Sequence, residues 1–196
     1  PKNLATEDLN ALKMGIPNLL RHIENLSKFG IPTVVAINKF PTDTNAEIES
    51  IQNICKEKGV NAVLAEHWAE GGKGASKLAE EVVEIIEKKE VNFKFLYEDS
   101  ETPQFKIEKI ANEIYRADTV SFSPAAKKKL SEIEKLGFDH FPVCMAKTQY
   151  SFSTDPKNKC APENHEITIR EIRISAGAEF IVAIAGDIMT MPGLPK

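Results

Sequence analysis

The stretch Thr33-Val34-Val35-Ala36-Ile37-Asn38-Lys39-Phe40-Pro41-Thr42-Asp43-Thr44 decides the fold class of this chain. It begins with a run of apolar and β-branched residues without alternation, which is typical of a buried strand in a parallel sheet. A polar loop follows, and Thr44 with Glu47 three places on forms a capping box that begins a helix. Strand, loop and helix in this order predict an α/β fold.

The same order repeats immediately downstream. A helical face ends at Gly59, residues 60–65 form a second apolar strand, and a second loop over residues 66–74 precedes another helical pattern. Upstream, Pro17 predicts a break between two helical segments. Because both loops leave the carboxyl ends of parallel strands, we expect them at one sheet edge, where open α/β sheets bind ligands.

The second half of the chain has a more mixed pattern. Residues 90–102 are charged and irregular, so we predict one α/β domain over residues 1–95 and a smaller mixed α/β domain over residues 96–196. Thr102-Pro103 and Ser123-Pro124 each place proline after a capping residue, which predicts two helix starts. Further on, the alternation of isoleucines slips between Arg170 and Glu171, as a β-bulge produces.

Composition excludes several classes of protein. The 196 residues carry 25 Lys and Arg against 29 Asp and Glu, a net charge of −4, whereas nucleic-acid binding usually needs a basic face. The sequence contains no apolar run of about 18 residues, so it predicts no membrane helix. Three widely spaced cysteines suit a reducing compartment rather than a disulfide framework. We therefore expect a cytoplasmic protein with neither nucleic acid nor membrane as a partner.

The first loop is the first candidate for chemistry. Its Asn38-Lys39 pair is similar to the base-recognition loop of P-loop nucleotide enzymes, in which the amide binds the base edge and the lysine stem packs over the ring. For the dipeptide taken alone, a capped turn between strand and helix is the simpler explanation. Phe40, followed by Pro41, is a poor choice for a solvated turn, which favours either a core residue or a stacking platform for a flat ligand.

The second loop carries the only tryptophan of the chain, Trp68, and a glycine-rich run from Gly71 to Gly74. Glycines allow close backbone approach to a ligand, and two aromatic residues on adjacent loops can enclose one planar ring. The alternative is that Trp68 fills a seam between layers. The run lacks the spacing of a phosphate-binding loop, so it predicts no phosphate site.

Other polar residues give weaker signals. The four histidines are scattered and Cys144 lies in an apolar run, so we expect ordinary histidines, a core cysteine and no metal site. Lys147, Arg170 and Arg173 suit an anionic substrate, and a solvated strand face explains the two arginines equally well. The proline-rich stretch over residues 187–195 suits a ligand lip or a subunit contact.

Longer motifs resemble one enzyme family. The blocks are VAINKFPTDT (35–44), HWAEGGKG (67–74), FPVCMAKTQYS (141–151), REIRISAGA (170–178) and GDIMTMPGLP (186–195). In order and over nearly the whole chain, they resemble formate–tetrahydrofolate ligase, also called 10-formyltetrahydrofolate synthetase. The resemblance implies an ATP-dependent ligase that makes formyl phosphate from formate and ATP and passes the formyl group to tetrahydrofolate. It also implies that Mg²⁺ takes part and that the complete enzyme is a homotetramer.

The resemblance also implies roles for individual residues. Phe40 and Trp68 match the two residues that hold the folate ring, and Leu64 matches a pocket wall, while Asn38, Pro41, Gly71 and Gly72 are secondary candidates. The family's phosphate loop lies in an N-terminal region outside this sequence. We therefore expect a C-terminal fragment, comprising the remainder of a P-loop-NTPase-like, mostly parallel sheet domain followed by the smaller domain, with no catalytic residue, no tightly bound cofactor and no ligase activity alone. Two alternatives remain open, a folate- or nucleotide-binding module without turnover and a subunit-assembly domain.

Overall fold

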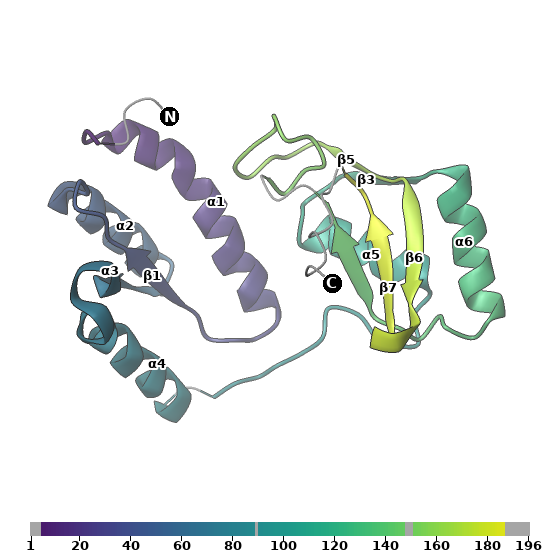
Figure 1. Cartoon of the computed structure of the whole chain (residues 1–196), viewed down its shortest axis with the longest axis horizontal. Helices are drawn as coiled ribbons and strands as arrows, with labels where there is room; N and C mark the ends of the chain where they lie inside the picture. Colours follow the sequence, from purple (N-terminus) through teal and green to yellow (C-terminus); the bar gives the residue numbers. More distant parts are fainter. Residues whose placement is uncertain (1–4, 89, 148–150, 187–196) are drawn as a thin grey trace, which may run out of the picture. The chain divides into compact units, whose positions relative to one another are not determined.

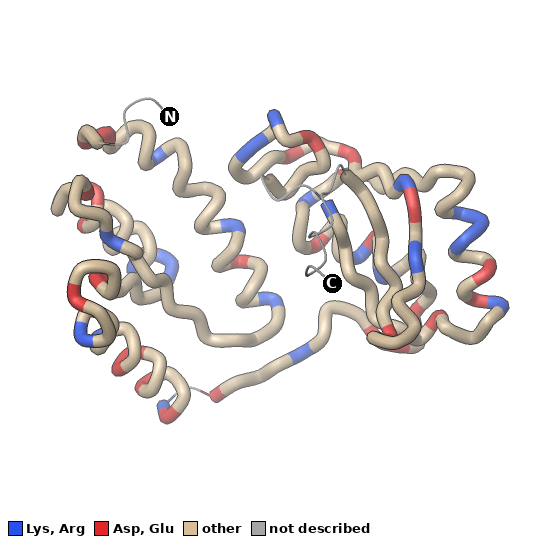
Figure 2. The backbone as a smooth tube through the Cα atoms, in the orientation of Figure 1, with Lys and Arg blue, Asp and Glu red and all other residues tan. Residues whose placement is uncertain are grey.

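The computed structural model describes residues 5–88, 90–147 and 151–186, and the chain divides into two units, Pro1–Lys94 and Phe95–Lys196 (Figure 1). Both units combine helices with strands, so the α/β class predicted from the sequence is confirmed. Figure 2 shows acidic and basic residues interspersed along the helices of each unit. Within the described ranges, no helix is both long enough and apolar enough to cross a lipid bilayer.

The first unit is built around two parallel strands. It contains, in chain order, α1 (Leu9–Lys28), β1 (Val34–Asn38), α2 (Asn45–Glu57), β2 (Asn61–Ala65), α3 (His67–Glu70), the 3-10 helix η1 (Gly71–Ala75) and α4 (Ser76–Lys88). The strands pair in register from Val34 opposite Asn61 to Asn38 opposite Ala65. The helix α2 connects them, as parallel pairing requires, because a tight turn cannot join two parallel strands.

Burial of β1 differs from the expectation. Only Ile37 is buried, while Ala36 and Asn38 are exposed. Among the described residues β1 pairs with one strand only, so it is not enclosed as a central strand of a larger parallel sheet would be.

The helix α1 runs through Pro17, so the predicted break is wrong. A proline inside a helix removes one backbone donor and crowds the preceding turn. Ile16 and Ile23, on the two sides of the proline, are both buried, and this packing holds the helix together across the defect. The Asp8 side chain caps the helix by accepting from the backbone N–H groups of Asn10 and Ala11 at 3.1 and 2.9 Å.

The predicted capping box of α2 is confirmed. The Thr44 hydroxyl accepts from the Glu47 N–H at 3.3 Å, and the Glu47 carboxylate accepts from the Thr44 N–H at 3.1 Å. The same carboxylate accepts from the Asp8 N–H at 3.0 Å, which ties the start of α1 to the start of α2. These backbone donors lower the pKa of Glu47.

The second unit combines parallel and antiparallel strand pairs. Its elements are α5 (Pro103–Glu113), β3 (Thr119–Phe122), α6 (Pro124–Lys135), β4 (Val143–Ala146), β5 (Glu166–Ile169), β6 (Glu171–Ser175), the 3-10 helix η2 (Ala176–Ala178) and β7 (Phe180–Ile184). β3 pairs with β5 in parallel, whereas β7 pairs in parallel with β4 and antiparallel with β6. Thr102 and Ser123 cap α5 and α6, each with proline in the first turn, so both predicted helix starts are confirmed.

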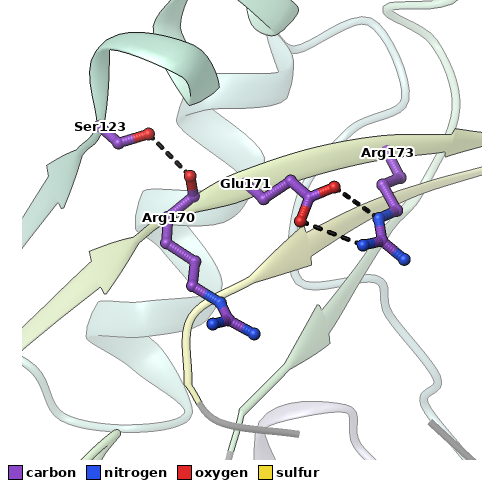
Figure 3. A network of polar contacts seen from close by, with 4 residues as sticks. All are labelled: Ser123, Arg170, Glu171 and Arg173. Atoms are coloured by element: carbon purple, nitrogen blue, oxygen red, sulfur yellow. Dashed lines mark hydrogen bonds and ion pairs between the residues drawn. The ribbon is translucent and has the colours of Figure 1, made fainter.

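The chain switches strand partners at Arg170, where the sequence predicts a β-bulge (Figure 3). The slip in alternation arises because β5 and β6 belong to different sheets, not because of a bulge within one strand pair. Ile169 still belongs to the β3 side, because its carbonyl accepts from the Ser123 N–H at 2.9 Å. Arg170 already belongs to the β7 side, because its N–H donates to the Ile184 carbonyl at 2.9 Å. The Ser123 hydroxyl donates to the Arg170 carbonyl at 2.7 Å and thereby fixes the switch to the start of α6.

Cys144 is exposed, so the expectation of a core cysteine is wrong. Successive residues of β4 point to opposite faces of the sheet, and Val143 takes the face that packs against the core. That core is the main buried cluster of the second unit. Its fully buried members include Ile107, Ala111, Ala126, Ile133, Ile167, Ile169, Ile181 and Ala183.

A fully buried lysine holds together three segments of the second unit. The Lys106 ammonium on α5 donates to the carbonyls of Asp99 and Asp139 at 2.8 Å and of Phe141 at 3.2 Å. Its nitrogen also lies 5.8 Å from the centre of the Tyr97 ring. Burial lowers the pKa of Lys106, and the nearby carboxylates of Asp99 and Asp139 oppose that change. Lys106 lies on the buried face of α5, and the three carbonyls compensate the burial of its positive charge.

We expect Lys106→Met to lower the free energy of unfolding of the second unit by about 3 kcal/mol, because it leaves buried carbonyls without their donor. The matched control is Lys109→Met on the same helix, whose ammonium makes a partly exposed pair with Glu113 at 3.7 Å. The control should change stability by less than about 0.5 kcal/mol. Urea denaturation followed by circular dichroism measures both, and equal losses in the two variants would contradict this role of Lys106.

Candidate functional site

The parallel register of β1 and β2 brings two candidate segments to one sheet edge. Asn38 ends β1 opposite Ala65, which ends β2, so the residues after both strands start side by side. The Lys39 N–H donates to the Ala65 carbonyl at 3.1 Å, which extends the pairing one residue past the strand. This is the carboxyl edge, where the sequence places the candidate binding residues.

The first segment is a tight turn that presents Phe40 to solvent. The Phe40 N–H donates to the Asp43 carboxylate at 2.8 Å, and the Asp43 N–H donates to the Phe40 carbonyl at 3.0 Å. Asn38 and Pro41 are exposed, and Phe40 is 57% exposed. Phe40 is therefore not a core residue, which removes one of the two explanations that the sequence leaves open.

The second segment is helical rather than a loop. Trp68 lies on α3 and is 75% exposed, so the alternative in which it fills a seam is wrong. Its neighbour His67 is exposed as well. The single helical turn of α3 runs directly into η1, where Gly71 and Gly72 are exposed and Gly71 has a φ of +60°.

A close backbone approach closes this helical turn. The Glu66 N–H donates to the Gly74 carbonyl at 2.9 Å, across the whole of α3 and most of η1. A Cβ on Gly74 would lie 2.5 Å from both the carbonyl carbon and the oxygen of Glu66. Only glycine fits at this position, so one glycine of the run serves the shape of the segment itself.

An ion pair joins the two segments. The Lys39 ammonium lies 2.8 Å from the Glu66 carboxylate, with exposed side-chain fractions of 30% and 38%. The Glu66 carboxylate raises the pKa of Lys39, with smaller contributions from Asp43 and Glu70. In the part of the chain that the structure describes, the rings of Phe40 and Trp68 contact no other aromatic ring. Two exposed aromatic side chains thus stand on two segments that are tied to each other.

Leu64 lies in a different environment from the two aromatic residues. It lines a surface hollow of about 390 Å³ that neither Phe40 nor Trp68 lines. The hollow is bordered by α2, β2 and the start of α4, through Asn45, Ile48, Glu49, Gln52, Ala62, Val63, Leu64 and Lys77. The structure therefore places Leu64 beside the carboxyl edge, along β2, without joining it to the aromatic pair.

The polar residues of the second unit form contacts within the protein. The Lys147 ammonium bonds to the Ser151 carbonyl and lies 5.1 and 6.0 Å from the ring centres of Tyr115 and Phe152. Burial lowers the pKa of Lys147 and raises that of Tyr115 to about 12. Arg173 makes a bidentate pair with Glu171 at 2.6 and 3.1 Å (Figure 3). The solvated-face explanation therefore fits Arg173 well.

Some expectations concern residues that the structure does not describe. Residues 148–150 and the proline-rich stretch of residues 187–195 lie outside the described residues. Across residues 5–88, 90–147 and 151–186, no cluster of three or more His, Cys, Asp or Glu residues is arranged to hold a metal ion. Sequence reasoning missed the Lys39–Glu66 pair, although an acidic residue directly after the second strand, matching the lysine after the first, is a usable signal.

These features define an α/β protein with two exposed aromatic side chains near the carboxyl edge of a parallel strand pair. Comparison with known proteins gives the family. The family model described as formate–tetrahydrofolate ligase matches residues 1–196. The chain belongs to the formate–tetrahydrofolate ligase family, as the sequence motifs predict.

Relatives of that name come from several organisms. The chain is 53% identical to the one from Maricaulis maris over 100% of its own length and 35% of the relative. It is 54% identical to those from Pelagibacter ubique and Beijerinckia indica, covering 35% and 36% of those proteins. The chain thus spans about a third of the length of the curated relatives it matches.

Gly74 offers a test of the second segment. We expect Gly74→Ala to displace α3, to lower the free energy of unfolding by about 1–3 kcal/mol and to change the emission of Trp68 in the ligand-free protein. Gly72→Ala is the matched control, because a Cβ at that position would meet no atom within 4 Å and its φ is not positive. Identical spectra and stabilities for the two variants would contradict the close approach at Glu66.

Proposed function

We propose that this chain supplies the tetrahydrofolate side of an ATP-dependent ligase that joins formate to tetrahydrofolate through formyl phosphate. The observation that carries the proposal is the pair of exposed aromatic side chains at one sheet edge, Phe40 at 57% and Trp68 at 75% exposure. Family membership supports the same reaction class. The product of the complete enzyme is 10-formyltetrahydrofolate.

Physical chemistry favours a flat ligand at this edge. Large aromatic surfaces exposed to water are costly, and a planar ring between them would bury both faces at once. Each aromatic contact adds about 0.5–1.5 kcal/mol beyond the buried area. In this arrangement the pteridine ring lies between Phe40 and Trp68.

Five further residues complete the proposed pocket. Leu64 contributes an apolar wall in the adjacent hollow along β2, which extends the proposed site away from the edge. Asn38 offers an amide to the polar rim of the ring. Pro41 stiffens the turn after the first strand. Gly71 and Gly72 let the backbone approach the ligand, since both are exposed and carry no Cβ.

The remaining machinery belongs to the larger part of the polypeptide. Phosphoryl transfer needs a phosphate cradle and Mg²⁺, and this sequence contains no phosphate-binding loop. Among the described residues, the parallel sheet of β1 and β2 is far smaller than usual. We therefore take the unit that carries the two aromatic segments as the remainder of a larger P-loop-NTPase-like sheet domain, followed by a second mixed domain. The ATP site lies elsewhere in the polypeptide, and the complete enzyme is a homotetramer.

A second candidate function is subunit assembly without turnover. The observation that favours it is the set of exposed apolar side chains on α4, where Val83 is 51% and Ile86 is 73% exposed. An uncovered apolar helix face of this kind is typical of a surface that another part of an assembly covers. This function is compatible with ligand binding at the other segments.

Titration of the lone tryptophan tests the binding proposal. We expect tetrahydrofolate to quench Trp68 emission saturably, and Phe40→Ala to weaken the affinity about tenfold by removing one stacking face. Phe105→Ala is the matched control, since Phe105 is an exposed phenylalanine, at 41%, on a helix of the second unit. Absence of saturable quenching in the unmodified chain would contradict the proposed pocket.

An activity assay tests the division of the machinery. We expect the purified chain to form no 10-formyltetrahydrofolate from ATP, formate and tetrahydrofolate, because the phosphate cradle is not encoded in it. Chromatography of the folate products measures this. A full-length relative assayed in parallel provides the positive control, and product dependent on all three substrates would contradict the proposal.

A further inference from the structure

The ion pair between Lys39 and Glu66 connects two separate segments of the first unit. A second ion pair of that unit, by contrast, lies within one helix. Lys88 and Glu84 stand four residues apart on α4, with side chains 68% and 57% exposed. Lys39 and Glu66 are 27 residues apart, are less exposed, and join the ends of two different strands. A bond between two segments restricts their relative movement, which a bond within one helix does not.

Both partners stand next to the aromatic residues on fixed backbone. Lys39 directly precedes Phe40, and its own N–H is bonded to the Ala65 carbonyl at 3.1 Å. Glu66 is the N-cap residue of α3, two positions before Trp68, and its N–H is bonded to a carbonyl of η1 at 2.9 Å. The side-chain pair therefore spans two anchored points, each within two residues of an exposed ring.

The charges around Lys39 give the pair a particular role. Carboxylates from both segments act on its ammonium, since Glu66, Asp43 and Glu70 all favour its charged form. Lys39 is thus a cation that offsets the mutual repulsion of acidic groups on the two segments. Without it, like charges on opposite sides favour separation of the segments.

We propose that Lys39 and Glu66 are positioning residues that set the separation and mutual orientation of the Phe40 and Trp68 rings, and so determine which thickness of planar ligand fits between them. The ligand part of this inference rests on the proposed function, whereas the ring geometry does not. Neither residue needs to touch the ligand. The pair selects a single flat ring system by holding the two aromatic faces at a fixed spacing.

A ligand-free measurement tests the ring geometry. In ¹H–¹⁵N spectra of the full 196-residue chain, Lys39→Met should shift both the Trp68 indole N–H and the Phe40 amide. The matched control, Lys88→Met, removes a helix-surface pair at 3.0 Å and should shift neither signal. The charge reversal Lys39→Glu/Glu66→Lys should return both signals toward their original positions. Thermal melting of each variant checks that it is folded.

A ligand titration tests the consequence for binding. We expect Lys39→Met to weaken tetrahydrofolate binding, followed by Trp68 quenching, about tenfold, and Glu66→Gln to weaken it about threefold, because the amide oxygen of the new side chain still accepts from the ammonium. The reversal should recover most of the affinity. If the unmodified chain binds no tetrahydrofolate, the proposed function fails and the ligand-free spectra alone decide on the pair. If Lys39→Met leaves the Trp68 indole N–H and the Phe40 amide unshifted, as Lys88→Met does, the inference is overturned.

Discussion

Parallel pairing of strands that are separated in the chain by helices is the constraint on which this structure depends. In the first unit it brings the residues after β1 and β2 to one edge, with Asn38 opposite Ala65 although the whole of α2 lies between them in the chain. In the second unit it joins β3 to β5 and β4 to β7 across long connections. Because parallel strands need such connections, each residue at the end of one of these parallel strands has a partner from a distant part of the sequence. The candidate site arises from that property.

Local signals made much of the fold predictable. The capping box at Thr44 and the capped prolines after Thr102 and Ser123 depend on residues close in sequence, and the structure confirms all three. The slip at Arg170 was visible for the same reason, because alternation is a local property of a strand. Pro17 failed as a signal because packing on both sides of it outweighs a local defect. Cys144 failed because its exposure depends on which face of β4 the core covers.

The sequence indicates which residues belong to the candidate site, but not how the two segments that carry them fold and contact each other. Aromatic residues such as Phe40 and Trp68 stand out in a polar stretch, and the repeated strand–loop–helix pattern predicts that both lie at one sheet edge. The ion pair of Lys39 with Glu66 required the register, which periodicity alone does not supply. The helical form of α3 was hidden because a single turn has no periodic pattern to detect. Lys106 was likewise hidden, since a lysine on a helix is usually solvated.

Lys106 and Lys39 illustrate opposite uses of the same side chain. Lys106 is fully buried among carbonyls, so its charge is compensated in one fixed geometry and it serves the architecture of the second unit. Lys39 keeps 30% of its side chain exposed and faces carboxylates from two segments. Its contribution to stability is therefore small, because solvent screens an exposed pair. An ion pair that contributes little to stability, and that we propose to position two exposed rings, is better explained by binding than by folding.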